Sequence, residues 1–145
     1  MATRTGSAEW KGDLQEGEGI VASESGTVDA SYSFSRFGDA ATGPQTNPEE
    51  LIAAAHASCF SMALSHELSE AGHVPDSIRT TARVDVRPQP EGGFAITRSA
   101  LESVGRVPGI DADDFQRFAE GAKVGCPVSK ALGAIEIVLE ARLEG

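Results

Sequence analysis

The sequence predicts a single α+β domain in which a largely antiparallel sheet packs against one long central helix. Two observations support this fold class. Segments of alternating apolar and polar residues are separated by turns rich in glycine and proline, and one long segment, residues 48–71, has helical caps at both ends. The order is strands, long helix, strands, short helices and a last strand, which is typical of α+β proteins. We expect one domain over residues 1–145.

Three short strands are expected before the helix. They lie at residues 7–12, 17–23 and 26–34. A polar segment follows at residues 36–47, and its glycine and proline residues indicate a loop that leads into the helix.

The long helix has a clear beginning and a clear end. Asn47 suits the N-cap, Pro48 suits the first helical position, and Glu49 and Glu50 favour the positive end of the helix dipole. Gly72 is a typical residue just past a helix C-terminus, so the helix is expected to end before it.

Apolar and small residues occupy most of the circumference of this helix, which predicts that it is buried on most sides. A row of small residues would allow a second helix to approach closely, such as the same helix of a second copy in a homodimer. The two apolar rows and the small row are Leu51, Ala55, Cys59 and Met62; Ile52, Phe60, Leu64 and Leu68; and Ala54, Ser58, Ser61 and Ser65.

A β-hairpin is expected after the helix. Residues 78–87 alternate between apolar and polar side chains, and a turn with two prolines and two glycines separates them from a second strand at residues 94–104. The alternation slips near Arg98, which predicts a β-bulge there.

Two shorter helices and one strand complete the chain. Asp111 is expected to cap a helix that carries apolar residues on one face and ends at Gly125. Cys126, followed by Pro127, then opens a short helix that ends near residue 132. The alternation at residues 135–143 predicts the last strand.

The composition limits the class of partner and the compartment. The net charge is −10, so we expect no binding to nucleic acid or to an anionic membrane surface. No apolar run reaches the ~18 residues of a membrane span, and the polar beginning of the chain lacks a signal peptide. We therefore expect a soluble, cytoplasmic protein, in which two cysteines are core thiols, metal ligands or redox groups rather than a permanent crosslink.

Each cysteine has a structural and a chemical interpretation. Cys126, at the expected start of a helix, is either a buried inert thiol or a thiolate stabilised by free backbone N–H groups. Cys59 lies in the middle of the long helix, where a cysteine is usually a core residue. It would need a nearby cation to act as a nucleophile, and Arg36 and His56 are the candidates, although His56 is equally a structural or hydrogen-bonded residue.

A metal site is a weaker alternative. His56 and Cys59 have helical spacing, and Cys126, His66 or His73 could complete a zinc site, but no paired metal-binding motif supports it. We therefore expect no metal and no bound cofactor.

Several segments together resemble the OsmC/Ohr family, the osmotically inducible protein C and organic hydroperoxide resistance proteins. Residues 47–65, NPEELIAAAHASCFSMALS, carry the strongest resemblance, and the AAHA sequence before Cys59 is similar to the OsmC branch. The other matching segments are residues 24–26, 35–37, 93–97, 107–112 and 125–130, the last of which contains Cys126.

This resemblance implies an antioxidant enzyme of the stress response, a peroxidase that reduces organic hydroperoxides and, less efficiently, hydrogen peroxide. It implies that Cys59 attacks the peroxide, that Cys126 resolves the sulfenic acid as a disulfide, and that Arg36 and Glu49 prepare the thiolate. It also implies an intertwined homodimer and a dithiol reductant, for which a lipoyl protein is plausible and thioredoxin or a small thiol remain alternatives.

The spacing of Glu49 and Cys59 adds a geometric expectation. Ten residues of α-helix span about 15 Å, so Glu49 would not reach the Cys59 of its own helix. An antiparallel partner helix would bring it there, which places the active sites at the homodimer interface. The alternatives to an enzyme are a ligand-binding protein and a redox sensor that keep the same dimeric fold.

Overall fold

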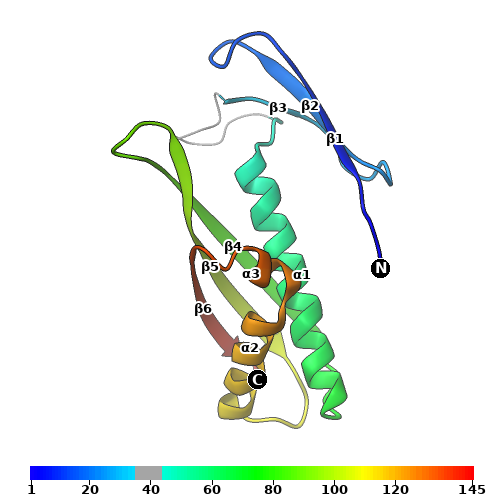
Figure 1. The fold of residues 1–145 in the computed structure, drawn as a ribbon. Coiled ribbons are helices and arrows are strands. Elements are labelled where there is room, and N and C mark those ends of the chain that lie inside the picture. The colour runs from blue at the N-terminus through cyan, green and yellow to red at the C-terminus, as the bar shows by residue number, and fades with distance from the viewer. Residues whose placement is uncertain (35–43) are drawn as a thin grey trace. The chain divides into compact units, whose positions relative to one another are not determined.

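The computed structural model describes residues 1–34 and 44–145, drawn in Figure 1. The chain divides into two compact units, Met1–Leu51 and Ile52–Gly145. The first unit contains one sheet and the beginning of the long helix, and the second contains the rest of that helix and the other elements.

The first unit is built on a three-stranded antiparallel sheet. Its strands are β1 (Gly6–Lys11), β2 (Glu18–Ser23) and β3 (Asp29–Tyr32), in the order β1-β2-β3. The rings of Trp10 and Tyr32 pack with their centroids 5.4 Å apart. The three predicted strands are therefore confirmed, with bounds shifted by a few residues.

Helix α1 (Pro48–Glu70) begins and ends as the caps predicted. The side-chain Oδ1 of Asn47 accepts a hydrogen bond of 2.8 Å from the backbone N–H of Glu50, which satisfies one of the free donors at the helix start. At the other end Gly72 has a φ of 89°, a left-handed conformation that glycine adopts without strain. The backbone N–H of His73 then bonds to the carbonyl of Leu68 at 2.8 Å.

The expected burial of α1 on most sides is wrong for the single chain. One row is buried, whereas in the other apolar row Leu51 and Cys59 are half-buried and Met62 is 74% exposed. The difference arises because one side of α1 packs against the sheet and α2 of the second unit, whereas Ala54, Ala55 and Ser58 are exposed on another side. The buried row consists of His56, Phe60, Leu64 and Leu68.

The second unit contains a separate three-stranded sheet, so the strands form two sheets and not the single one expected. Its strands are β4 (Ser77–Pro88), β5 (Phe94–Arg106) and β6 (Glu136–Leu143), in the order β4-β5-β6. The β4–β5 hairpin is antiparallel, but β6 runs parallel to β5. The parallel pairing arises because two helices, and not a tight turn, connect β5 to β6.

The expected bulge lies next to Arg98. Asp85 pairs with Arg98 and Val86 pairs with Ile96, so Thr97 is the extra residue on β5. The turn of this hairpin has Gly92 and Gly93 at φ of 99° and 76°.

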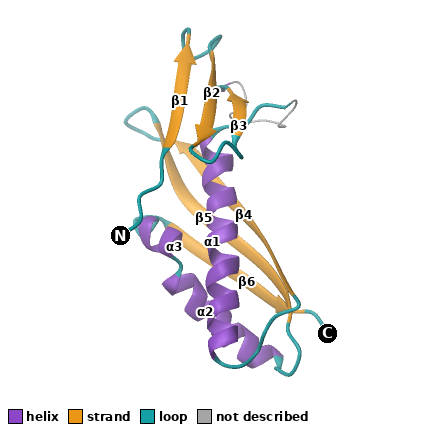
Figure 2. Ribbon diagram, turned by 90° about the vertical axis from the view of Figure 1, so that its right-hand side faces the viewer, coloured by secondary structure: helices purple, strands orange, loops and turns teal. Residues whose placement is uncertain are grey.

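Two helices follow the hairpin, α2 (Ala112–Gly125) and α3 (Pro127–Ala131). Asp111 caps α2 by accepting a hydrogen bond of 2.8 Å from the backbone N–H of Asp114, as predicted. Figure 2 shows α1 and α2 lying across the sheet of β4, β5 and β6, and their buried side chains form one core with that sheet. Within the described residues, none of the helices is long and apolar enough to cross a membrane.

Candidate active site

The two cysteines, which are far apart in the sequence, meet in the second unit. Cys59 lies on α1, and Cys126 is the residue between α2 and α3, where it is the N-cap of α3. Both are free thiols, and they lie close enough for each to affect the pKa of the other. The fold thus brings the two thiols together with no disulfide between them.

The two thiols differ in their access to solvent. Cys126 is fully buried, with 0% of its surface exposed, whereas Cys59 is partly exposed. Cys126 belongs to the core of the unit, and Cys59 packs against that core from its edge. A small molecule from solvent therefore reaches the sulfur of Cys59 before that of Cys126.

The two thiols also differ in acidity. Burial raises the pKa of the Cys59 thiol, and its contact with Cys126 acts in the same direction, while the backbone of Val128 opposes them. Burial also acts to raise the pKa of Cys126, but hydrogen bonds from the Ser129 backbone, the Cys59 thiol and the Ser129 hydroxyl bring it below its ordinary value. Among the described residues Cys126 is therefore the more acidic thiol of the pair.

The start of α3 explains much of this acidity. Cys126 makes no cap hydrogen bond of standard geometry, but the backbone N–H groups of Ser129 and Val128 lie close enough to its sulfur to stabilise a thiolate. Pro127 holds the first position of α3, as the sequence predicted. Cys126 is thus a buried core residue whose thiol has a lowered pKa, so neither interpretation of it is excluded.

His56 is a hydrogen-bonded core residue and not the cation that Cys59 would need. Its ring is fully buried, and both nitrogens are occupied: Nδ1 lies 2.7 Å from Ser99 Oγ and Nε2 lies 2.9 Å from Ser129 Oγ. Burial lowers the pKa of His56, so the ring is neutral near pH 7. The interpretation of His56 as a hydrogen-bonded residue is therefore confirmed.

The two remaining predicted site residues have different positions. Arg36 lies outside the described residues. Glu49 is in the first turn of α1 and is partly exposed, and Cys59 is on the same helix, about 15 Å further along its axis. The neighbouring Glu50 accepts a hydrogen bond of 2.9 Å from the hydroxyl of Thr46.

The residues suggested for a zinc site do not assemble one. In the described ranges, no group of three or more histidine, cysteine, aspartate or glutamate side chains is placed to hold a metal ion. His56, the central member of the suggested set, uses both ring nitrogens for serine hydroxyls.

Two residues of this site, Ser99 and Ser129, were not identified from the sequence. Ser99 is fully buried on β5, and Ser129 is 5% exposed on α3. A serine in the apolar phase of an alternating strand was the available signal for Ser99, because a buried hydroxyl requires a hydrogen-bond partner. The partner itself is 43 residues away in the sequence and has no local signature.

Comparison with known proteins gives a consistent result. Residues 40–140 match the family model described as OsmC-like protein. The chain is 50% identical to peroxiredoxin OsmC of Escherichia coli strain K12 over 142 residues, covering 97% of this chain and 96% of that one. It is 33% identical to an organic hydroperoxide resistance protein of Xanthomonas axonopodis pv. citri over 124 residues, with 84% of both chains covered.

Solved structures show the same fold. A crystal structure of an organic hydroperoxide resistance protein from Elizabethkingia anophelis superposes with a TM-score of 0.74 at 26% identity, covering 99% of this chain and 98% of that one. The corresponding protein OhrB of Bacillus subtilis gives a TM-score of 0.71 at 27% identity, covering 94% of this chain and 97% of that one. Both comparisons support the mixed α+β fold.

Proposed function

The chain belongs to the OsmC-like protein family, and from the arrangement of its two thiols we propose that it is a thiol-dependent peroxidase that reduces organic hydroperoxides to alcohols. The names of its relatives, peroxiredoxin and organic hydroperoxide resistance protein, support a peroxide-related redox role. The observation that carries the finer proposal is that a partly exposed Cys59 and a buried Cys126 lie close together in the fold.

Access assigns the attacking role to Cys59. A peroxide must approach the sulfur along its O–O axis, and Cys126 has no exposed surface for such an approach. In the first step the Cys59 thiolate attacks the terminal oxygen, the O–O bond breaks, and the departing alkoxide takes a proton to become an alcohol. Cys59 is left as a sulfenic acid.

Acidity alone would favour the opposite assignment, since Cys126 is the more acidic thiol. Arg36 would resolve this conflict, because a permanent guanidinium charge beside Cys59 would lower its pKa and orient the peroxide. Glu49 would hold that guanidinium. The distance along α1 favours a Glu49 supplied by the second protomer of a homodimer.

Cys126 suits the second step. Its thiolate attacks the sulfur of the Cys59 sulfenic acid, an S–S bond forms, the S–O bond breaks, and hydroxide leaves as water after taking a proton. An external dithiol then reopens the disulfide by thiol exchange, and a lipoyl protein is the reductant we favour. The reaction uses no metal and no bound organic cofactor.

Peroxide consumption with dithiothreitol as reductant tests this proposal. We expect turnover of cumene hydroperoxide to exceed that of hydrogen peroxide, to be abolished by Cys59→Ser and to fall at least about 100-fold in Arg36→Ala. Arg83→Ala is the matched control, since it removes an exposed arginine of β4 that pairs with Glu102.

Two results would contradict the proposal. Full turnover in Cys59→Ser together with none in Cys126→Ser would mean that the two roles are reversed. No turnover in the unmodified protein, with both thiols shown to be free, would favour the binding or sensing function.

A further inference from the structure

A line of three buried side chains leads from the sheet to the sulfur of Cys126. Ser99 on β5 bonds to Nδ1 of His56 at 2.7 Å, and Nε2 of His56 bonds to Ser129 at 2.9 Å. Ser129 is in the first turn of α3, three residues after the N-cap Cys126, and its hydroxyl acts to lower the pKa of the Cys126 thiol. Ser99 and His56 have 0% of their surface exposed and Ser129 has 5%, so water does not compete for these contacts.

The direction of these hydrogen bonds follows from the number of protons available. A Cys126 thiolate would accept hydrogen bonds and donate none, so the Ser129 hydroxyl beside it would donate its single proton to the sulfur. Ser129 Oγ then accepts from His56, which must carry its proton on Nε2. A neutral imidazole has one N–H group, so Nδ1 accepts the proton of Ser99.

The opposite direction is unfavourable because of Ser99. If Ser129 donated to Nε2, then Nδ1 would donate to Ser99, and the Ser99 proton would need another acceptor. Ser99 is fully buried, and among the described residues its hydroxyl hydrogen-bonds to His56. An unsatisfied buried donor is costly, so Ser99 biases the whole line toward donation to Cys126.

We propose that His56 is a positioning residue for Cys126, which, with Ser99 behind it, holds the Ser129 hydroxyl as a hydrogen-bond donor to the Cys126 sulfur. This inference rests on the proposed function, because the Cys126 thiol positioned in this way would be the resolving thiol that attacks the Cys59 sulfenic acid. Among the described residues, the titratable group facing this sulfur is Cys59 on α1, while the neutral His56 stands behind Ser129.

A second buried hydroxyl cluster provides a matched control. Ser103 lies four residues after Ser99 on β5 and is also fully buried. Its hydroxyl hydrogen-bonds to Thr80 Oγ1 at 2.9 Å. Thr80 bonds to Ser61 of α1 at 2.8 Å, so this cluster also joins the sheet to α1. Ser103→Ala therefore removes an equally buried hydroxyl from the same strand.

Titration of Cys126 in a Cys59→Ser background, followed by the ultraviolet absorbance of the thiolate, tests the proposal. We expect Ser129→Ala to raise the pKa of Cys126 by about one unit, and His56→Leu to raise it by about half a unit. His56→Gln, which keeps one donor and one acceptor, should restore most of the parent value, and Ser103→Ala should leave it unchanged. Thermal unfolding of each variant confirms that it is folded at the titration temperature.

The outcome is independent of peroxide turnover, because the titration uses no peroxide. A Cys126 pKa within about 0.2 unit of the parent in either Ser129→Ala or His56→Leu would overturn the proposal. An equal rise in Ser103→Ala would also overturn it, by showing that any buried hydroxyl has the same effect. If His56→Leu does not fold, Ser99→Ala replaces it: a rise of the Cys126 pKa supports the proposal, and a pKa within about 0.2 unit of the parent overturns it.

Discussion

Gly105 of β5 lies directly against the aromatic ring of Phe115 on α2. A Cβ atom at this position would lie 2.5 Å from Cζ of that ring, closer than packed atoms approach. Phe115 is 1% exposed and belongs to the core of the second unit, so its ring has little freedom to move aside. The glycine is therefore required by close packing between strand and helix.

We expect Gly105→Ala to lower the free energy of unfolding by about 1–3 kcal/mol, the usual cost of overpacking a core. Gly121→Ala is the control: it lies inside α2, and the nearest atom to its added methyl group would be Oε2 of Glu67 at 3.9 Å. This control should be neutral or stabilising, by up to ~1 kcal/mol, because alanine favours the helix. Urea denaturation measures both, and equal stability of the two variants would contradict the packing argument.

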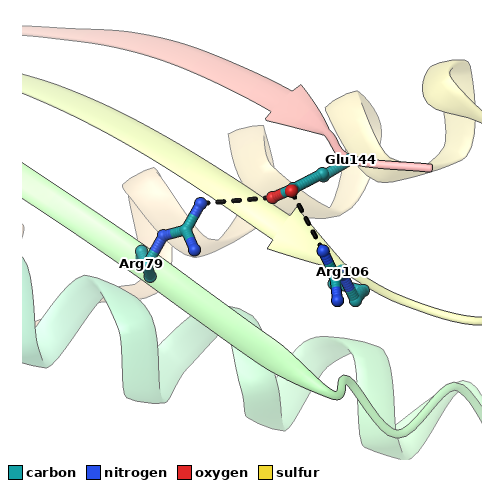
Figure 3. A network of polar contacts seen from close by, with 3 residues as sticks. All are labelled: Arg79, Arg106 and Glu144. Carbon is teal, nitrogen blue, oxygen red and sulfur yellow. Dashed lines mark hydrogen bonds and ion pairs between the residues drawn. The ribbon is translucent and has the colours of Figure 1, made fainter.

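At the scale of the elements, the end of the chain joins three strands. Glu144 directly follows β6, and its carboxylate accepts hydrogen bonds from Nη2 of Arg79 on β4 at 3.1 Å and from Nη2 of Arg106 on β5 at 3.0 Å (Figure 3). The Glu144 side chain is 33% exposed, so solvent screens these ion pairs. The hydrogen bond and charge of Arg106, with the charge of Arg79, lower the pKa of Glu144 below its ordinary value.

This shift gives a pH dependence with a definite sign. Because the folded state lowers the pKa of Glu144, its stabilising effect is present above the ordinary carboxyl pKa and is lost as the pH falls through the lowered value. We expect Glu144→Gln to be less stable than the parent at pH 7 in low salt, and the difference to shrink on acidification and in high salt. Thermal unfolding measures it, and a difference unaffected by pH would contradict the ion-pair explanation.

At the scale of the whole molecule, the exposed row of α1 supports the proposed homodimer. Met62 is 74% exposed, and Ala55 of the same row is small and also exposed. The opposite row of α1 is fully buried. A second copy of α1 would cover this row and would bring the Glu49 of one protomer toward the Cys59 of the other.

We expect Met62→Arg to weaken self-association at least about tenfold, because it would bury an unpaired charge in the interface. Val124→Arg is the control, since Val124 on α2 is 71% exposed and apolar but lies on another helix. Sedimentation over a range of concentrations measures both. A monomeric parent protein with full peroxidase activity would contradict the proposed dimer.

The sequence by itself determined the elements of this fold and most of their ends. The Asn47 and Asp111 caps, the glycine after α1 and the alternation of β4 and β5 each depend on residues close together in the chain. Such local signals can be recognised without knowledge of the fold. For the same reason the acidity of Cys126 could be anticipated, since its helix begins at the next residue.

The tertiary structure decided everything that depends on which distant residues meet. The sequence did not show that β6 runs parallel to β5, that the strands form two sheets, or that α1 leaves Met62 exposed. It did not predict that His56 lies between Ser99 and Ser129, because these contacts join α1 to β5 and α3 across long stretches of chain. Partners of buried polar groups are set by packing, which has no local pattern in a sequence.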